Sequence, residues 1–197
     1  QDELIDGTLL GSYAKQAGDR FAYNDGDGST RYDVDYPLQL AAFDPTFHDA
    51  SLNVQTLPFA DMDDKYPMFN GRGYPDTTNP STALPYEHGA SSPVSTLMTP
   101  TAGDRMLVRI SSLSTTSFHT IGIFGLKMQV VGKGSRQLEE PYLTNSITIG
   151  GGESVDVIVD TAGTTAGDKY FIYATNLDHL SNDTEDYGGM MTEIQIQ

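Results

Sequence analysis

Residues 105–132 read RMLVRISSLSTTSFHTIGIFGLKMQVVG, and the hydrophobic pattern of this segment predicts the fold. Met106, Val108 and Ile110 alternate with the residues between them, as in a β-strand that buries one face. After a Ser/Thr-rich turn the apolar pattern resumes and continues from Ile121 to Val131. We expect two strands joined by a loop here, in the core of a β-sandwich.

Outside this segment the chain has further strand patterns and no long helical period. Val155, Val157 and Val159 share one face of a strand expected at residues 154–160, and the Gly run before it predicts a hairpin turn. Residues 134–142 are predicted to form a loop, as are the residues that follow Pro45. Other strands are expected at residues 35–44, 65–70, 143–149, 169–175 and 190–196. About eight strands without helices predict an all-β, Greek-key β-sandwich.

The length and the loops set the domain organisation. A chain of 197 residues with 38% hydrophobic residues can bury one large core. Residues 1–35 are polar and rich in Gly and Asp, which predicts an N-terminal arm, and residues 36–197 form the expected domain. Residues 76–100 are rich in Pro, Thr and Ser and predict a long loop excursion that crosses between sheets.

The charge balance excludes several classes of partner. The chain has 11 Lys and Arg against 27 Asp and Glu, a formal net charge of -16. Such a field repels phosphate backbones and anionic lipid head groups, so we expect neither nucleic acid nor a membrane as partner. The sequence has no signal peptide and no apolar segment long enough to cross a membrane.

Cysteine is missing from the chain altogether. This excludes disulfides, thiolate nucleophiles, Cys-based structural zinc sites and a blue-copper centre of the His₂Cys type. The chain has four histidines, and they are scattered singly at positions 48, 88, 119 and 179. The sequence therefore predicts no catalytic residue in this chain.

Three segments resemble the multicopper oxidase family, the laccase-like enzymes that are built from cupredoxin domains. The first is the quoted segment, from the Gly-Asp-Arg before its strand to the closing Gln-Val-Val-Gly. The second is YFIYATNLDHLSNDTEDYGGMM at residues 170–191, which is similar to the family's final strand and ligand loop. The third is FNGR at 69–72 with YPDT at 74–77, which resembles the N-G-R-x-Y-P segment in the middle domain of three-domain members.

The resemblance also implies where copper ligands would lie in a copper-bearing relative. His119 matches the first histidine of the family's H-x-x-H-x-H-G-H cluster, and the other three positions hold Gly, Phe and Leu. Thr175 matches the cysteine if one residue is deleted after Leu177. The remaining positions of this vestigial type 1-like set are His179 for the later histidine and Met190 or Met191 for the axial methionine.

The resemblance implies a cupredoxin-type sandwich that is the copper-free, non-catalytic middle domain of a laccase-like enzyme. Its role would be to space the flanking cupredoxin domains, which would be its partners, and an isolated copy would expose apolar patches and self-associate. Copper would belong to the parent enzyme, which oxidises phenolic substrates and reduces dioxygen, and this chain would hold no cofactor. An extracellular or periplasmic location is implied in the same way.

Three other interpretations remain open from the sequence. His119, His179 and a methionine match enough of the copper set for a free-standing metal-binding protein. A β-sandwich rich in Tyr and Phe is also typical of extracellular sugar-binding modules, although this chain has no Trp. Finally, Asp25, Asp27 and Ser29 place oxygen atoms at alternate positions of one loop, which makes them a candidate calcium site without the full EF-hand pattern.

Overall fold

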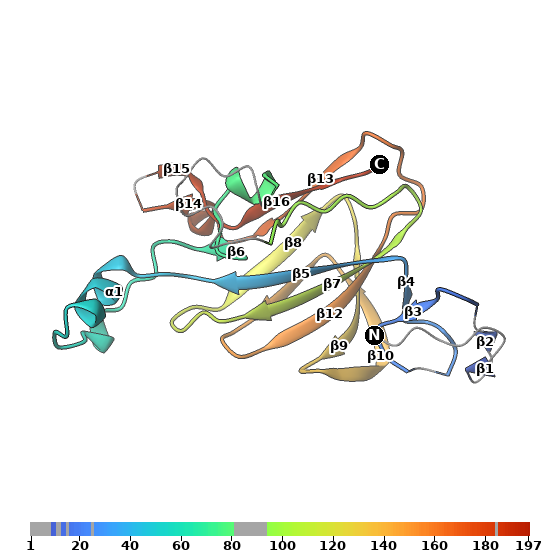
Figure 1. Ribbon diagram of the computed structural model, residues 1–197, viewed down its shortest axis with the longest axis horizontal. Coiled ribbons are helices and arrows are strands. Elements are labelled where there is room, and N and C mark those ends of the chain that lie inside the picture. Colours follow the sequence, from blue (N-terminus) through green and yellow to red (C-terminus); the bar gives the residue numbers. More distant parts are fainter. Residues whose placement is uncertain (1–8, 11–12, 15, 25, 81–93, 184) are drawn as a thin grey trace.

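The computed structural model describes residues 9–10, 13–14, 16–24, 26–80, 94–183 and 185–197. Its main body is a sandwich of two β-sheets, with α1 (Pro45–Leu52) at one end and the N-terminal arm at the other (Figure 1). The all-β sandwich predicted from the sequence is confirmed. Within the described residues, no helix is long and apolar enough to span a membrane.

The larger sheet contains six strands in the order β10-β9-β12-β7-β5-β6. Their bounds are Arg136–Thr144 (β10), Met128–Lys133 (β9), Ser154–Asp160 (β12), Arg105–Ser112 (β7), Val34–Ala41 (β5) and Met68–Phe69 (β6). Strand β7 pairs antiparallel with β12 and parallel with β5. The inward residues of β7 and β12, Val108, Ile110 and Val157 among them, are fully or almost fully buried, as their alternation predicted.

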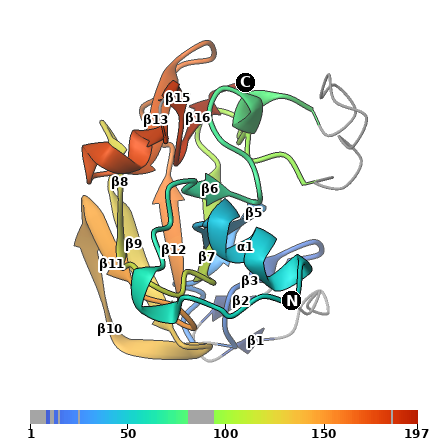
Figure 2. The same ribbon diagram turned by 90° about the vertical axis from the view of Figure 1, so that its left-hand side faces the viewer.

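The smaller sheet contains four strands in the order β11-β8-β13-β16. Their bounds are Ser146–Ile149 (β11), His119–Phe124 (β8), Lys169–Ala174 (β13) and Met191–Gln195 (β16). The two sheets face each other in Figure 2, and the chain crosses from one to the other between β7 and β8 and again between β8 and β9. One core fills the space between them, from Leu38 and Phe69 on the larger sheet to Ile172 and Ile194 on the smaller.

Short elements complete the described structure. The arm contains the pairs β1 (Leu9–Leu10) with β2 (Tyr13–Ala14) and β3 (Arg20–Phe21) with β4 (Arg31–Tyr32). Three 3-10 helices lie at Phe59–Asp61 (η1), Asp76–Thr78 (η2) and Leu177–Leu180 (η4), and a last pair is formed by β14 (Ser181–Asn182) and β15 (Glu185–Gly188).

Three expectations about local structure were wrong. Residues 105–132 contain three strands, because Gly125 turns the chain at a φ of +90° and sends β8 and β9 to different sheets. Residues 136–144 form β10, which has no apolar alternation because it is an edge strand exposed along most of its length. Pro45 begins α1 where a loop was expected, because Asp44 caps the helix by accepting from the backbone amides of Thr46 and Phe47.

Candidate functional site

The candidate site begins at His119, the first residue of β8. The alternation of that strand turns His119, Ile121 and Ile123 toward the core, and His119 is completely buried. A buried imidazole needs hydrogen-bond partners. One partner is the hydroxyl of Ser114 in the preceding loop, whose Oγ lies 2.6 Å from His119 Nε2.

The second partner is His179, which lies 60 positions further along the chain in η4. Strands β8 and β13 are neighbours, with Ala174 opposite Ile121, so the residues after β13 emerge beside the start of β8. His119 Nδ1 and His179 Nδ1 are 3.1 Å apart, and the two rings meet edge to face with their centroids 4.8 Å apart. The two histidines that the family resemblance singled out therefore do come together.

One arrangement of protons satisfies every contact of these two rings. The side-chain amide of Asn176 donates to His179 Nε2 over 3.4 Å. His179 Nδ1–H then donates to His119 Nδ1, and His119 Nε2–H donates to Ser114 Oγ. In this chain of bonds both imidazoles are neutral.

The electrostatics agree with neutral rings. Burial and, to a smaller extent, the neighbouring His179 lower the pKa of His119 to about 4, while the carboxylate of Asp64 opposes the shift. Burial also lowers the pKa of His179, against a smaller opposing effect of Asp178. Both side chains are therefore uncharged at neutral pH, and their ring nitrogens serve as hydrogen-bond donors and acceptors.

The other vestigial copper positions lie in different surroundings. Met190 is fully buried in the hydrophobic core, and its backbone amide donates to the carbonyl of His179 over 2.7 Å. Met191 is partly exposed and alternates with the buried Thr192, so it faces away from the core. Thr175 is exposed, and its hydroxyl donates to the carbonyl of Thr120. Neither Thr175 nor Met191 takes part in the His119–His179 network.

The residues present do not fit the copper centres of the enzymes they resemble. A blue-copper site needs a thiolate, and the chain has no cysteine. The donor set around the two imidazoles is a serine hydroxyl and an amide. Within the described ranges, no three His, Asp or Glu side chains gather closely enough to hold a metal ion.

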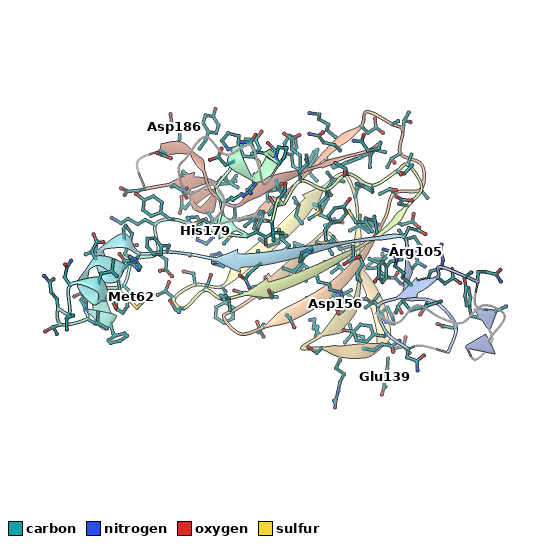
Figure 3. The ribbon with its side chains drawn as sticks, in the orientation of Figure 1. Met62, Arg105, Glu139, Asp156, His179 and Asp186 are labelled. Carbon is teal, nitrogen blue, oxygen red and sulfur yellow. The ribbon has the colours of Figure 1, made fainter. Side chains whose placement is uncertain are left out.

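A polar cavity of about 630 Å³ opens beside His179. Acidic side chains dominate its wall, and Lys65 lies between two of them, 3.6 Å from Asp63 and 3.7 Å from Asp183. The hydroxyl of Thr116 donates to Asp64 at the same rim. His179 and Met62 mark this part of the molecule in Figure 3, on the side toward α1. The cavity gives solvent a route to the outer ring of the pair.

The loop proposed for calcium is partly outside the described residues, since Asp25 is not among them. Asp27 accepts from the backbone amide of Ser29 over 2.9 Å, which accounts for the turn. The carbonyl of Ser29 accepts from the guanidinium of Arg105 over 2.7 Å, and that positive charge disfavours a cation at the same oxygen. The calcium site stays a prediction.

Sequence reasoning missed the two residues that complete the histidine network. Asn176 caps η4 by accepting from the backbone amide of Asp178. An Asn just before a short turn predicts a cap, in which its side-chain oxygen accepts from a backbone amide of the turn. Ser114 carried no such signal, because its position depends on how the loop before β8 folds. His48 is exposed on α1 with its ring near Phe43, and His88 lies outside the described residues.

Comparison with known proteins agrees with the family resemblance of the three sequence segments. The family model described as multicopper oxidase matches residues 49–193. Solved structures with the same fold include the blue copper oxidase from Nitrosomonas europaea (21% identity, TM-score 0.64, covering 82% of this chain and 43% of the other). A second is the multicopper oxidase mgLAC, which is 16% identical with a TM-score of 0.65 over 83% of this chain and 44% of the other. A third is the laccase from Botrytis aclada, which is 18% identical with a TM-score of 0.57 over 86% of this chain and 30% of the other. The chain thus spans less than half of each of these proteins, and no curated protein sequence matches it.

Proposed function

Because the chain belongs to the multicopper oxidase family, we propose that it is a non-catalytic, copper-free cupredoxin domain that spaces and orients its neighbours in a larger enzyme. The observation that carries this proposal is the donor set at the ligand positions. The buried imidazole of His119 and the partly buried imidazole of His179 are satisfied by each other, by Ser114 and by Asn176, and the sequence offers no thiolate. Other domains of the parent enzyme would hold the copper, bind the phenolic substrate and reduce dioxygen.

The middle position in a three-domain parent is part of the same proposal. It is supported by the N-G-R-x-Y-P resemblance, whose arginine has a structural role. Arg72 is 3% exposed and donates to the carbonyl of Asn79 over 2.7 Å. It thereby holds the turn that contains η2 against the end of β6.

One group of exposed apolar side chains supports packing against a neighbouring domain. It lies on α1, on the residues that follow it, on the loop between β7 and β8, and on η4, at the same end of the sandwich (Figure 1), whereas other exposed apolar side chains such as Phe124 and Leu143 lie elsewhere. The members of this group are Leu52, Val54, Phe59, Leu113, Phe118 and Leu177. Surfaces of this kind are usually covered by a partner, either a flanking cupredoxin domain or, in an isolated copy, a second molecule.

The first test is an oxidase assay on the purified chain. With copper supplied and a phenolic substrate such as 2,6-dimethoxyphenol, we expect oxygen consumption no faster than that of copper and buffer alone, because the chain has no cysteine to ligate a blue-copper ion. An oxygen electrode measures the rate. Oxygen uptake that rises in proportion to the protein concentration and continues over many turnovers would contradict the proposal.

One observation favours a second candidate function, binding of a single metal ion. Two nitrogens that are each about 2.0–2.1 Å from one tetrahedral zinc ion lie roughly 3.3 Å apart. The Nδ1 atoms of His119 and His179 are already 3.1 Å apart, and both rings are neutral. A metal ion would have to replace the hydrogen bond between the rings and take its other ligands from water.

Calorimetric titration with copper and zinc separates the two functions. We expect no stoichiometric binding tighter than micromolar, since two imidazoles are a weak ligand set. The matched variants are His179→Ala at the site and His48→Ala on the exposed face of α1. Tight binding that disappears in His179→Ala and persists in His48→Ala would replace the copper-free proposal with the metal-binding one.

A further inference from the structure

The outer face of the larger sheet, which points away from the sandwich core, has one apolar row across β7 and β12 with polar rows on both sides of it. In the apolar row, Leu107 of β7 lies opposite Ile158 of β12, and both are at most 2% exposed. The arm covers this pair with Ala22 and Tyr32, and the four side chains form a small second core together with Val131. The arm therefore covers the apolar row, and its Tyr23 reaches the polar row beside it.

The next two rows of the same face are polar. Arg109 of β7 lies opposite Asp156 of β12, and Ser111 lies opposite Ser154. These residues alternate with the buried Ile110 and are themselves partly exposed. The cross-strand register thus builds a patch with one positive charge, one negative charge and two hydroxyls.

Tyr23 forms one wall beside this patch. Its hydroxyl donates to Asp156 Oδ2 over 2.6 Å. The ring can approach the sheet only because residue 132 is glycine, since a Cβ there would lie 2.1 Å from the Tyr23 oxygen. Burial and the bond to Asp156 raise the pKa of Tyr23 above its usual value, so the phenol stays protonated and Asp156 is held in a fixed position.

A cavity of about 510 Å³ lies over the polar rows, between the arm and the turn that joins β9 to β10. The turn contributes Ser135, which has a φ of +62°, and β5 contributes Pro37. A volume of this size suits a small molecule. In Figure 3 the label of Asp156 marks its position, toward the arm and away from His179.

The lining selects a class of ligand. The charges of Arg109 and Asp156 offset each other within the cavity, and the net charge of -16 disfavours an anion. A cation is disfavoured because the positive guanidinium of Arg109, which lines the cavity, repels it. Three serine hydroxyls with an arginine and a carboxylate suit a ligand that both donates and accepts hydrogen bonds, and the rings of Tyr23 and Pro37 offer apolar contact.

We propose that this cavity is a binding site for a neutral polyhydroxylated ligand such as a monosaccharide unit, with Arg109, Asp156 and the paired serines 111 and 154 as its polar contacts. The site lies on the opposite face of the sheet from the core and is separate from the His119–His179 network. It is independent of the proposed spacer function, so either proposal can fail without the other.

The experiment is an NMR titration of the ¹⁵N-labelled chain with the methyl glycosides of glucose, galactose and mannose. We expect at least one of them to shift the amide signals of β7 and β12 next to the cavity, with a Kd in the millimolar range, as suits a ligand of about twelve non-hydrogen atoms. Arg109→Met is expected to weaken binding at least tenfold, because it leaves the ligand oxygens without a charged donor.

The controls keep the result interpretable. Lys127→Met carries the same charge change on the turn between β8 and β9 and should leave the Kd unchanged. Ser154→Ala is a smaller change that serves if Arg109→Met unfolds the chain, and it should weaken binding several-fold. The proposal is overturned if none of the three glycosides shifts these signals, or if citrate binds the cavity more tightly than the sugars.

Discussion

Acidification from pH 7 to pH 5 is expected to lower the free energy of unfolding by about 2 kcal/mol through His119 alone. Burial holds its pKa at about 4 in the folded chain, against 6.5 for an ordinary histidine. The unfolded state therefore takes up a proton as the pH falls below 6.5, and the folded state does not. Stability is complete above pH 6.5 and decreases until the pH reaches about 4, where both states are protonated. His179, whose pKa is also lowered, adds a loss of the same sign.

Urea unfolding at pH 7 and pH 5 measures this loss. In His119→Gln the titrating ring is absent while an amide remains to bond Ser114, so the stability of this variant should change much less over the same interval. His48→Gln is the matched control, because His48 is exposed on α1, and it should keep the full pH dependence. Equal pH dependence in the wild type and in His119→Gln would mean that the buried His119 does not titrate as its surroundings indicate.

The sequence predicted the parts of the fold in which each strand buries one face. Val155, Val157 and Val159 of β12 all lie in the core, as their alternation indicated. The pattern failed at β10, which has no fully buried residue, and the turn of Gly134 and Ser135 before it, both with positive φ, was predicted only as the start of a loop. Apolar and polar residues alternate where one face of a strand is buried, so an exposed edge strand shows no such pattern in its sequence.

The candidate site was predicted in part, and for a physical reason. His119 and His179 were found by resemblance, and neighbouring strands β8 and β13 do bring them together. Their hydrogen-bond partners depend on loop conformation, which hydrophobic patterns do not specify. The cavity beside Tyr23 was missed for a similar reason, since it requires the register of β7 against β12 and the path of the arm.

Gly73→Ala is expected to destabilise the chain by about 3 kcal/mol, because the added methyl group has no room. A Cβ at this position would lie 1.7 Å from the backbone carbonyl oxygen of Gly188, which closes β15. The backbone on both sides is fixed: Tyr74 N–H donates to the carbonyl of Gly189 over 3.0 Å, and the carbonyl of Gly73 accepts from Thr77. The two segments must therefore separate, and they cannot relax by rotating a side chain.

The matched control is Gly122→Ala in β8, where the nearest atoms to the added Cβ would be the Thr175 methyl group at 3.1 Å and the Asn145 carbonyl oxygen at 3.4 Å. The Thr175 side chain is exposed and can shift its methyl group by a few tenths of an ångström, so this variant should lose about 1 kcal/mol or less. Urea unfolding of both variants at pH 7 gives the comparison. Because Gly73 lies directly after the Asn-Gly-Arg segment, a large loss there and a small loss at Gly122 would show that this motif is a packing element of the domain. Equal losses would mean that β15 moves aside easily, and that the turn held by Arg72 is not rigidly packed against it.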